Sequence, residues 1–179
     1  KKETNEELKE WVRGGGKIIA IENAVRQMAK AEWGIKQKEV DAKKDSGKTD
    51  DYEHLKKYED RERDWLKSSM PGSIFKVELD HTHPLGFGYP DFYYTLKQDG
   101  NIYEFMKEGG WNVGVIKKDN YISGFAGSEI KGKLKDGLLI GAQDLGRGQV
   151  IYLADNPIFR SFWENGKLLL CNAVFLVGQ

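Results

Sequence analysis

The hydrophobic positions at the start of the chain recur at helical spacing and then change to the spacing of a strand. Leu8, Trp11 and Val12 lie on one helix face, and residues 4–7 (Thr-Asn-Glu-Glu) form a capping-box pattern before them. Three consecutive glycines, 14–16, end this predicted helix. The pattern therefore predicts a short amphipathic helix that begins near Thr4 and stops before a glycine turn.

A second helix is predicted after a short apolar run. Residues 17–21 (Lys-Ile-Ile-Ala-Ile) are typical of a buried parallel strand. Asn23 stands where it can cap the following helix, whose apolar face contains Val25 and Met28. Helix, glycine turn, strand and helix in this order indicate a doubly wound α/β sheet. Such a sheet normally begins with a strand, so its first strands are expected upstream of Lys1.

The composition changes between residues 35 and 70, where charged residues of both signs dominate. We interpret this segment as a solvated insertion, because mixed charge with few apolar residues cannot offset the entropy of ordering. Its second half, residues 51–67, carries apolar side chains at loosely helical spacing and predicts a helix lying on the domain. The whole chain, 1–179, is expected to be a single domain with this insertion.

The remaining patterns alternate with period two or are continuously apolar, and they indicate strands and a closing helix. Two runs, 138–142 and 150–154, flank Gly146-Arg147-Gly148 and predict an antiparallel hairpin at one edge of a mainly parallel sheet. The apolar tail, 167–177, predicts a helix packed on the sheet. Further strands are expected at 74–79, 92–96, 102–105 and 113–116.

Composition and charge exclude several partners. The 28 basic residues balance the 28 acidic residues, so no large field of one sign exists to attract nucleic acid. No apolar run approaches the length needed to span a membrane. We therefore expect neither a nucleic-acid partner nor a membrane span.

The sequence offers few candidates for catalysis or metal binding. His81 and His83 form a His-x-His pair, yet no third ligand stands at zinc-site spacing, and such pairs in loops are usually capping or packing groups. Cys171 lies in the apolar tail helix, where a cysteine is expected to behave as a small hydrophobe rather than as a nucleophile. We therefore predict no catalytic residue, no metal site and no cofactor in this chain.

The strand ends are the remaining candidates for a ligand site, since the carboxyl ends of strands form the crevice of an open α/β sheet. Glu22 and Asn23 follow the first predicted strand, and Asp155 follows the strand 150–154. These three residues are the candidate ligand-binding residues, with a carboxylate pair across the crevice as one arrangement. The alternative, which we favour, is that Asn23 and Asp155 are helix N-caps.

Residues 8–20 resemble the helix, glycine turn and strand that precede the nucleophile elbow of class I glutamine-amidotransferase-like domains. The elbow of an active member reads Gly-x-Cys-x-Gly, whereas residues 20–24 read Ala-Ile-Glu-Asn-Ala and place Glu22 at the cysteine position. The family's His-Pro-Glu is matched at best by residues 154–156 (Ala-Asp-Asn). The resemblance implies a flavodoxin-like, three-layer α/β sandwich and argues against the amidotransferase reaction.

A second resemblance covers nearly the whole chain. The matching stretches are 71–77, 80–88, 146–150, 159–163, 167–168 and 172–175. In this order they resemble the C-terminal domain of certain bacterial zinc carboxypeptidases, in which a carboxypeptidase A-like metallopeptidase domain precedes an amidotransferase-like domain. The resemblance implies that the zinc, its ligands and the catalytic glutamate belong to an upstream peptidase domain of the same polypeptide, and that the parent is periplasmic or secreted.

Three hypotheses follow for the function of this chain. The first is a non-catalytic accessory domain that stabilises or orients the upstream peptidase domain. The second is a ligand-binding module that uses the crevice at the strand ends. The third is an independent hydrolase or transferase that uses Glu22 and Asp155. The first requires a packing surface, the second a concave pocket, and the third a carboxylate with a raised pKa and a partner within reach.

Overall fold

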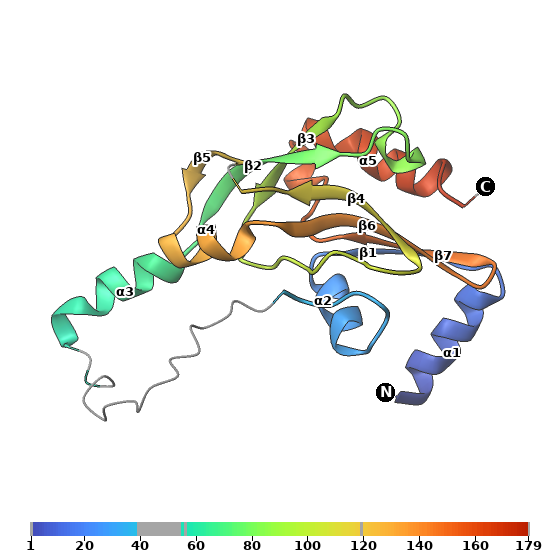
Figure 1. The fold of residues 1–179 in the computed structure, drawn as a ribbon, viewed down its shortest axis with the longest axis horizontal. Helices are drawn as coiled ribbons and strands as arrows, with labels where there is room; N and C mark the ends of the chain where they lie inside the picture. Colours follow the sequence, from blue (N-terminus) through green and yellow to red (C-terminus); the bar gives the residue numbers. More distant parts are fainter. Residues whose placement is uncertain (1, 39–54, 56, 119, 179) are drawn as a thin grey trace.

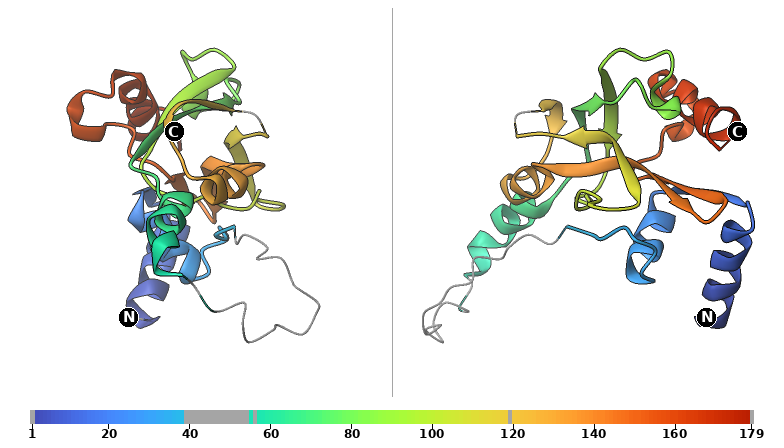
Figure 2. Two further views of the ribbon diagram at one scale, coloured as in Figure 1. Left: turned by 90° about the vertical axis from the view of Figure 1, so that its left-hand side faces the viewer. Right: turned by 45° about the vertical axis from the view of Figure 1, so that its right-hand side comes forward.

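The structure, a computed structural model, describes residues 2–38, 55, 57–118 and 120–178. A mixed β-sheet runs through the centre, with α1 and α2 on one side and α5 on the other (Figures 1 and 2). The strands are β1 (Lys17–Ile21), β2 (Gly72–Leu79), β3 (Phe92–Lys97), β4 (Gly110–Ile116), β5 (Tyr121–Phe125), β6 (Gly137–Leu145) and β7 (Gly148–Leu153). The helices are α1 (Lys2–Arg13), α2 (Asn23–Lys30), α3 (Arg61–Ser68), α4 (Ser128–Leu134) and α5 (Glu164–Phe175), with short 3₁₀ turns η2 (Tyr58–Asp60), η3 (Pro84–Gly86) and η4 (Phe159–Ser161).

The sheet has the strand order β1-β7-β6-β4-β2-β3, and β5 pairs separately with β2. Only β1 and β7 pair in parallel among the described strands, and the other pairings are antiparallel. The expected mainly parallel sheet is therefore corrected to a mixed one. The predicted hairpin of β6 and β7 is confirmed: its two-residue turn, with Gly146 at φ 65°, permits only antiparallel pairing.

The hydrophobic core is centred on β6 and β7, whose positions from Leu138 to Ile140 and from Val150 to Leu153 are all buried. Strands in the interior of a sheet that is covered on both faces lose the alternating pattern, which explains these continuous apolar runs. β1 lies at the sheet edge, and within it only Ala20 is fully buried. The inward faces of the helices contribute further buried side chains, including Val12, Val25, Met28, Leu169 and Ala173.

The predicted insertion at 35–70 begins and ends in the core rather than in solvent. Ile35 and Met70 are buried, and Lys38 N donates to Ile102 O at 2.9 Å. Residues 39–54 and 56, which include most of the predicted charged half, lie outside the described residues. In the second half, the α-helix is limited to Arg61–Ser68 (α3), so the helix predicted over 51–67 is confirmed only in part. The prediction that it lies on the domain is not confirmed, because α3 has no buried residue.

Other local predictions had mixed outcomes. α1 begins before Thr4, so the predicted capping box is wrong. The expected strand at 102–105 is reduced to isolated bridges from Tyr103 to Gln37 and Leu138. The closing helix is confirmed as α5, while β5 and α4 were not predicted.

Gly148, the first residue of β7, packs directly against the backbone of α1 and of the turn before β1. A Cβ atom there would lie 2.0 Å from Val12 O and 2.2 Å from Gly16 O, and neither backbone oxygen can move freely. We expect Gly148→Ala to lower the free energy of unfolding by about 3 kcal/mol. Gly132, inside α4 with no atom within 4 Å of the same position, is the matched control. Gly132→Ala should stabilise by about 0.5–1 kcal/mol in urea unfolding, because alanine favours helix. Similar losses for both variants would contradict this packing.

Candidate functional site

Glu22 forms a tight turn between β1 and α2. Its backbone has φ 50° and ψ −112°, a conformation that residues other than glycine rarely adopt. Glu22 N donates to Leu153 O at 2.9 Å, which continues the β1–β7 ladder, and Glu22 O accepts from Arg26 N at 3.3 Å, which starts the helix. One residue thus belongs to both elements, and the strain, on the order of 1–3 kcal/mol, is held by the packing around it.

The Glu22 side chain is exposed and does not cap α2. It makes no hydrogen bond to the helix amides, and its carboxylate accepts a long 3.5 Å contact from Asn156 Nδ2, in the segment that follows β7. The adjacent Asn23 is the first helical residue, not the N-cap, and its Oδ1 accepts from the Arg26 guanidinium at 2.7 and 3.1 Å. The predicted N-cap role of Asn23 is therefore wrong. The strand ends do bring together Glu22 and Asn156, as a polar pair open to solvent.

Asp155 turns away from the crevice and into the protein. Its side chain is 8% exposed, and it accepts hydrogen bonds from Lys97 Nζ at 2.7 Å and from Thr95 Oγ1 at 2.6 Å. It therefore neither caps a helix nor faces Glu22, and the expected carboxylate pair across the crevice does not form. The neighbouring Asn156 forms an Asx turn, since its Oδ1 accepts from Ile158 N at 3.1 Å.

Lys97 is the residue of this site that the sequence analysis missed. Its side chain is fully buried, and besides Asp155 its ammonium donates to Asn101 O at 2.8 Å. It shares the inward face of β3 with Tyr93 and Thr95, because side chains two positions apart point the same way. The sequence signal that could have found it is this period of two, since Lys97 follows Tyr93 and Thr95 at alternate positions.

The ion pair between Lys97 and Asp155 is closed to ligands. Burial raises the pKa of the Asp155 carboxyl, and the nearby ammonium of Lys97 opposes that rise. The cavity beside Asp155 has a volume of about 10 Å³, no more than one water-sized sphere occupies. The arrangement is therefore suited to holding β3 against the end of β7, and not to acid–base chemistry on a bound molecule.

The remaining sequence candidates have local roles. His83 Nδ1 accepts from Leu85 N at 3.1 Å and so caps η3, which confirms the capping interpretation for this histidine; burial lowers the pKa of its imidazole. Cys171 is exposed on α5, so the expectation that it would behave as a core hydrophobe is wrong. Within the described part of the chain, no cluster of three or more His, Cys, Asp or Glu could hold a metal ion. His54 lies outside that part.

The fold and these contacts define an α/β domain with a mixed sheet and a strained strand-to-helix turn. No family model matches the chain, and the search of curated proteins found no match. Among solved structures, a protein from Bacteroides uniformis described as ThuA-like aligns with 95% of this chain at 13% identity and a TM-score of 0.46. The chain spans 61% of the length of that protein. No helix in the described ranges is long and apolar enough to cross a membrane.

The buried ion pair predicts a pH-dependent loss of stability in Lys97→Met. Removing the ammonium leaves a buried carboxylate without a counter-charge, so the variant should lose about 3–5 kcal/mol of unfolding free energy at neutral pH. The pKa of Asp155 should rise further in this variant. When folding raises the pKa of a carboxyl group, the folded protein loses stability as the pH rises from the unfolded pKa to the raised one. The loss in unfolding free energy should therefore be larger at pH 8 than at pH 5.

Urea unfolding at both pH values measures this effect. The double variant Lys97→Met/Asp155→Leu is the control, and it should recover most of the loss because no charge remains buried. A loss of the same size at both pH values would show that the carboxylate is not the cause.

The strained turn predicts a different order of stability at Glu22. Glycine adopts the observed φ and ψ without a steric penalty, whereas alanine has the same penalty as glutamate. Glu22→Gly should therefore be more stable than Glu22→Ala by about 1 kcal/mol. Because the Glu22 side chain caps nothing, Glu22→Ala should lie within about 0.5 kcal/mol of the wild type. Chemical denaturation of the three proteins tests this order. An alanine variant as stable as the glycine variant would mean that the turn is not strained.

Proposed function

We propose that this chain is a non-catalytic accessory domain that docks onto the peptidase domain of a bacterial zinc metallocarboxypeptidase. The observation that carries the proposal is a second apolar face on α5, directed away from the sheet and exposed. Stabilising or orienting a neighbouring domain requires such a packing surface and no reactive group.

α5 is apolar on two faces, which an ordinary surface helix is not. Its inward face packs through Leu169 and Ala173, and Asn172 Nδ2 fixes it to η3 by donating to Leu85 O at 2.9 Å. Leu168, Cys171 and Phe175 lie three and four positions apart on the outward face, and all three are exposed. None of the residues that the structure describes covers Phe175, and its 64% exposure is large for a phenylalanine side chain.

The apolar surface continues onto the neighbouring loop. Phe87, which is 66% exposed, follows η3 directly, and its carbonyl accepts from Asn172 Nδ2 at 2.7 Å. A Cβ at Gly88 would lie 3.1 Å from Leu168 Cδ2, so the loop and the outward face of α5 are in contact. Contiguous apolar patches of this kind mark docking sites. We refer to Phe87, Leu168, Cys171 and Phe175 as the α5 patch.

A tethered partner fits this patch better than a free one. Docking between domains of one polypeptide is intramolecular, so the high effective concentration lets a modest apolar patch suffice. The expected occupant is the upstream peptidase domain, which would supply the zinc, its ligands and the catalytic glutamate. The export of such a parent to the periplasm or the medium is part of the same proposal.

The turn at Glu22 supports the finer fold assignment, a class I glutamine-amidotransferase-like domain that has lost the reaction. The backbone has the sharp, strained strand-to-helix geometry that an elbow nucleophile requires. The side chain there is a carboxylate, which is a far weaker nucleophile than a thiolate and would give a mixed anhydride instead of a thioester. The proposed domain therefore retains the turn without the chemistry.

A second function, ligand binding at the strand ends, is favoured by one observation. Glu22 keeps an exposed carboxylate at a strained position, 3.5 Å from the Asn156 amide, and strained residues cluster at ligand sites. This pair would recognise a ligand that both donates and accepts hydrogen bonds. It differs from the docking function in needing Glu22 and not the α5 patch.

Mass spectrometry of the native protein provides the first test, because the proposal requires a peptidase domain before Lys1. In that full-length protein, Phe175→Ser should lower the free energy of unfolding by about 2 kcal/mol, the value of a buried phenylalanine side chain. The same substitution should have little effect on the 179-residue chain alone, where Phe175 is exposed.

Trp65→Ser is the matched control, since Trp65 is also 64% exposed but lies on α3, outside the α5 patch. It should leave the full-length protein nearly unchanged. Absence of a peptidase domain from the native protein would overturn the proposal, as would equal effects of Phe175→Ser on both forms of the protein.

A further inference from the structure

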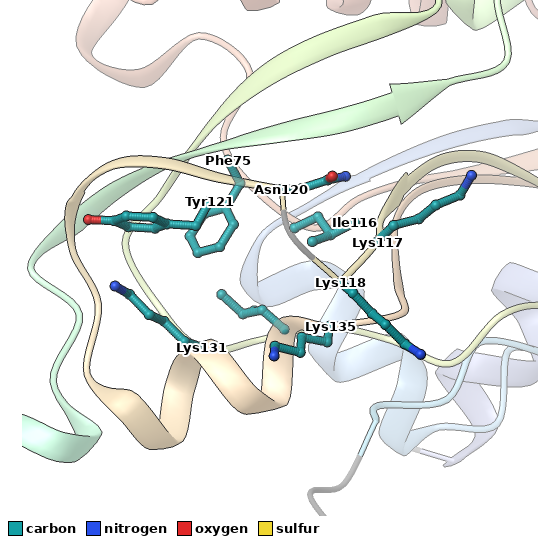
Figure 3. A pocket seen from close by; sticks show the side chains of 9 residues that line it. Phe75, Ile116, Lys117, Lys118, Asn120, Tyr121, Lys131 and Lys135 are labelled. Atoms are coloured by element: carbon teal, nitrogen blue, oxygen red, sulfur yellow. The ribbon is translucent and has the colours of Figure 1, made fainter.

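A cavity opens where β2 changes its neighbour. Along one edge of β2, the end at Glu78 and Leu79 pairs with β4, and the beginning, Gly72–Phe75, pairs with β5. The chain leaves β4 at Ile116 and returns at Tyr121, so the two ladders are not continuous. α4 lies beneath this gap, and between them is an open cavity of about 330 Å³ (Figure 3).

The floor of the cavity is apolar and aromatic. Phe75, Ile116 and Leu134 are buried there, and Tyr121 meets Phe75 edge-on with ring centroids 5.6 Å apart. The volume is at the lower end of the range for small-molecule sites. An apolar or aromatic group of a ligand would therefore find a preformed surface.

The rim is basic. Lys117, Lys118, Lys131 and Lys135 line the cavity from the end of β4 and from α4 (Figure 3). Lys117 forms an ion pair with Glu78, and the Lys131 ammonium lies 3.7 Å from the centroid of the Tyr121 ring. Among the described residues, Lys118, Lys131 and Lys135 form no ion pair.

Asn120 adds an unsatisfied hydrogen-bond donor. Its backbone oxygen accepts from Lys76 N at 2.7 Å, at the point where β2 changes its neighbour. Its side-chain Nδ2 is buried and has no hydrogen-bond partner, although the residue lines the cavity. Leaving a buried amide donor unpaired is unfavourable, and an oxygen atom of a ligand would satisfy it once the Asn120 side chain turns into the cavity.

We infer that this cavity binds a small organic phosphate monoester with an aromatic or apolar body. The three unpaired lysines carry more positive charge than a ligand with one carboxylate would neutralise. This holds even when the charge of Asp119, which follows Lys118 in the sequence and lies outside the described residues, is subtracted. A phosphate monoester carries nearly two negative charges at neutral pH and three acceptor oxygens. Its oxygens suit the lysines and Asn120 Nδ2, and its body suits the Phe75 and Tyr121 rings. The inference is independent of the proposed docking function, since the cavity shares no residue with the α5 patch.

Isothermal titration calorimetry with phenyl phosphate as the probe tests this site. Phenyl phosphate should bind one site per chain, at least tenfold more tightly than benzoate, inorganic phosphate or phenol, because only the first supplies both a dianion and a ring. Lys131→Gln should weaken its binding about tenfold, as expected for the loss of one charge-assisted contact. Lys133→Gln is the matched control, because Lys133 lies on the same helix but does not line the cavity. It should bind like the wild type.

Asn120→Leu separates binding from folding. Replacing an unpaired buried amide by an apolar group of similar shape should leave the melting temperature unchanged or higher, while phenyl phosphate affinity falls. The inference is overturned if phenyl phosphate does not bind, or if inorganic phosphate binds as well. Equal weakening in Lys131→Gln and Lys133→Gln would also overturn it, since that would indicate attraction to the surface charge alone.

Discussion

The buried ion pair of Lys97 and Asp155 is the interaction on which the shape of this domain depends. The hairpin of β2 and β3 is attached to the rest of the sheet by a short ladder, since β2 pairs with β4 at only two positions. Such a ladder leaves the position of β3 weakly specified. The contacts of Asp155 with Lys97 and Thr95 fix the end of β3 against the segment after β7. A misplaced hairpin would leave two charges buried without partners, which is far more costly than the correct pair.

The position of α5 follows from the same constraint. Once β3 is held over the end of β7, its outer backbone is available to the residues around the start of α5. Trp163 Nε1 and Asn165 Nδ2 both donate to Tyr94 O, at 3.3 and 2.7 Å. Leu169 packs beside the small cavity next to Asp155, and Asn172 binds the loop after β2. The inward face of α5 therefore packs on the domain, and its second apolar face is not covered by any of the described residues.

Patterns local in sequence predicted the elements whose partners are also local. The glycine turn at 146–148 predicted the hairpin of β6 and β7, and the apolar tail predicted α5. Strand directions in the middle of the sheet were not predictable, because alternation shows which face is buried but not which strand lies alongside. β5 is exposed at all five positions and has no such alternation, and α4 contains Gly132 and buries only Leu134. The gap between them, with its lysine rim, therefore had no sequence signal.

The sequence predicted where Glu22 lies along the chain fold, but it did not predict the contacts of the candidate residues. Glu22 does lie at the end of the first strand, because a strand followed directly by a helix requires a tight turn there. The strain at Glu22 follows from that connection: β1 must stay in register with β7, and α2 must return to bury Val25 and Met28. Any residue at position 22 would experience the same backbone demand, so the turn alone is no sign of catalysis. What such a turn can do depends on the group it presents, and a solvated carboxylate beside an amide is suited to hydrogen bonding, whereas forming a thioester requires a thiolate.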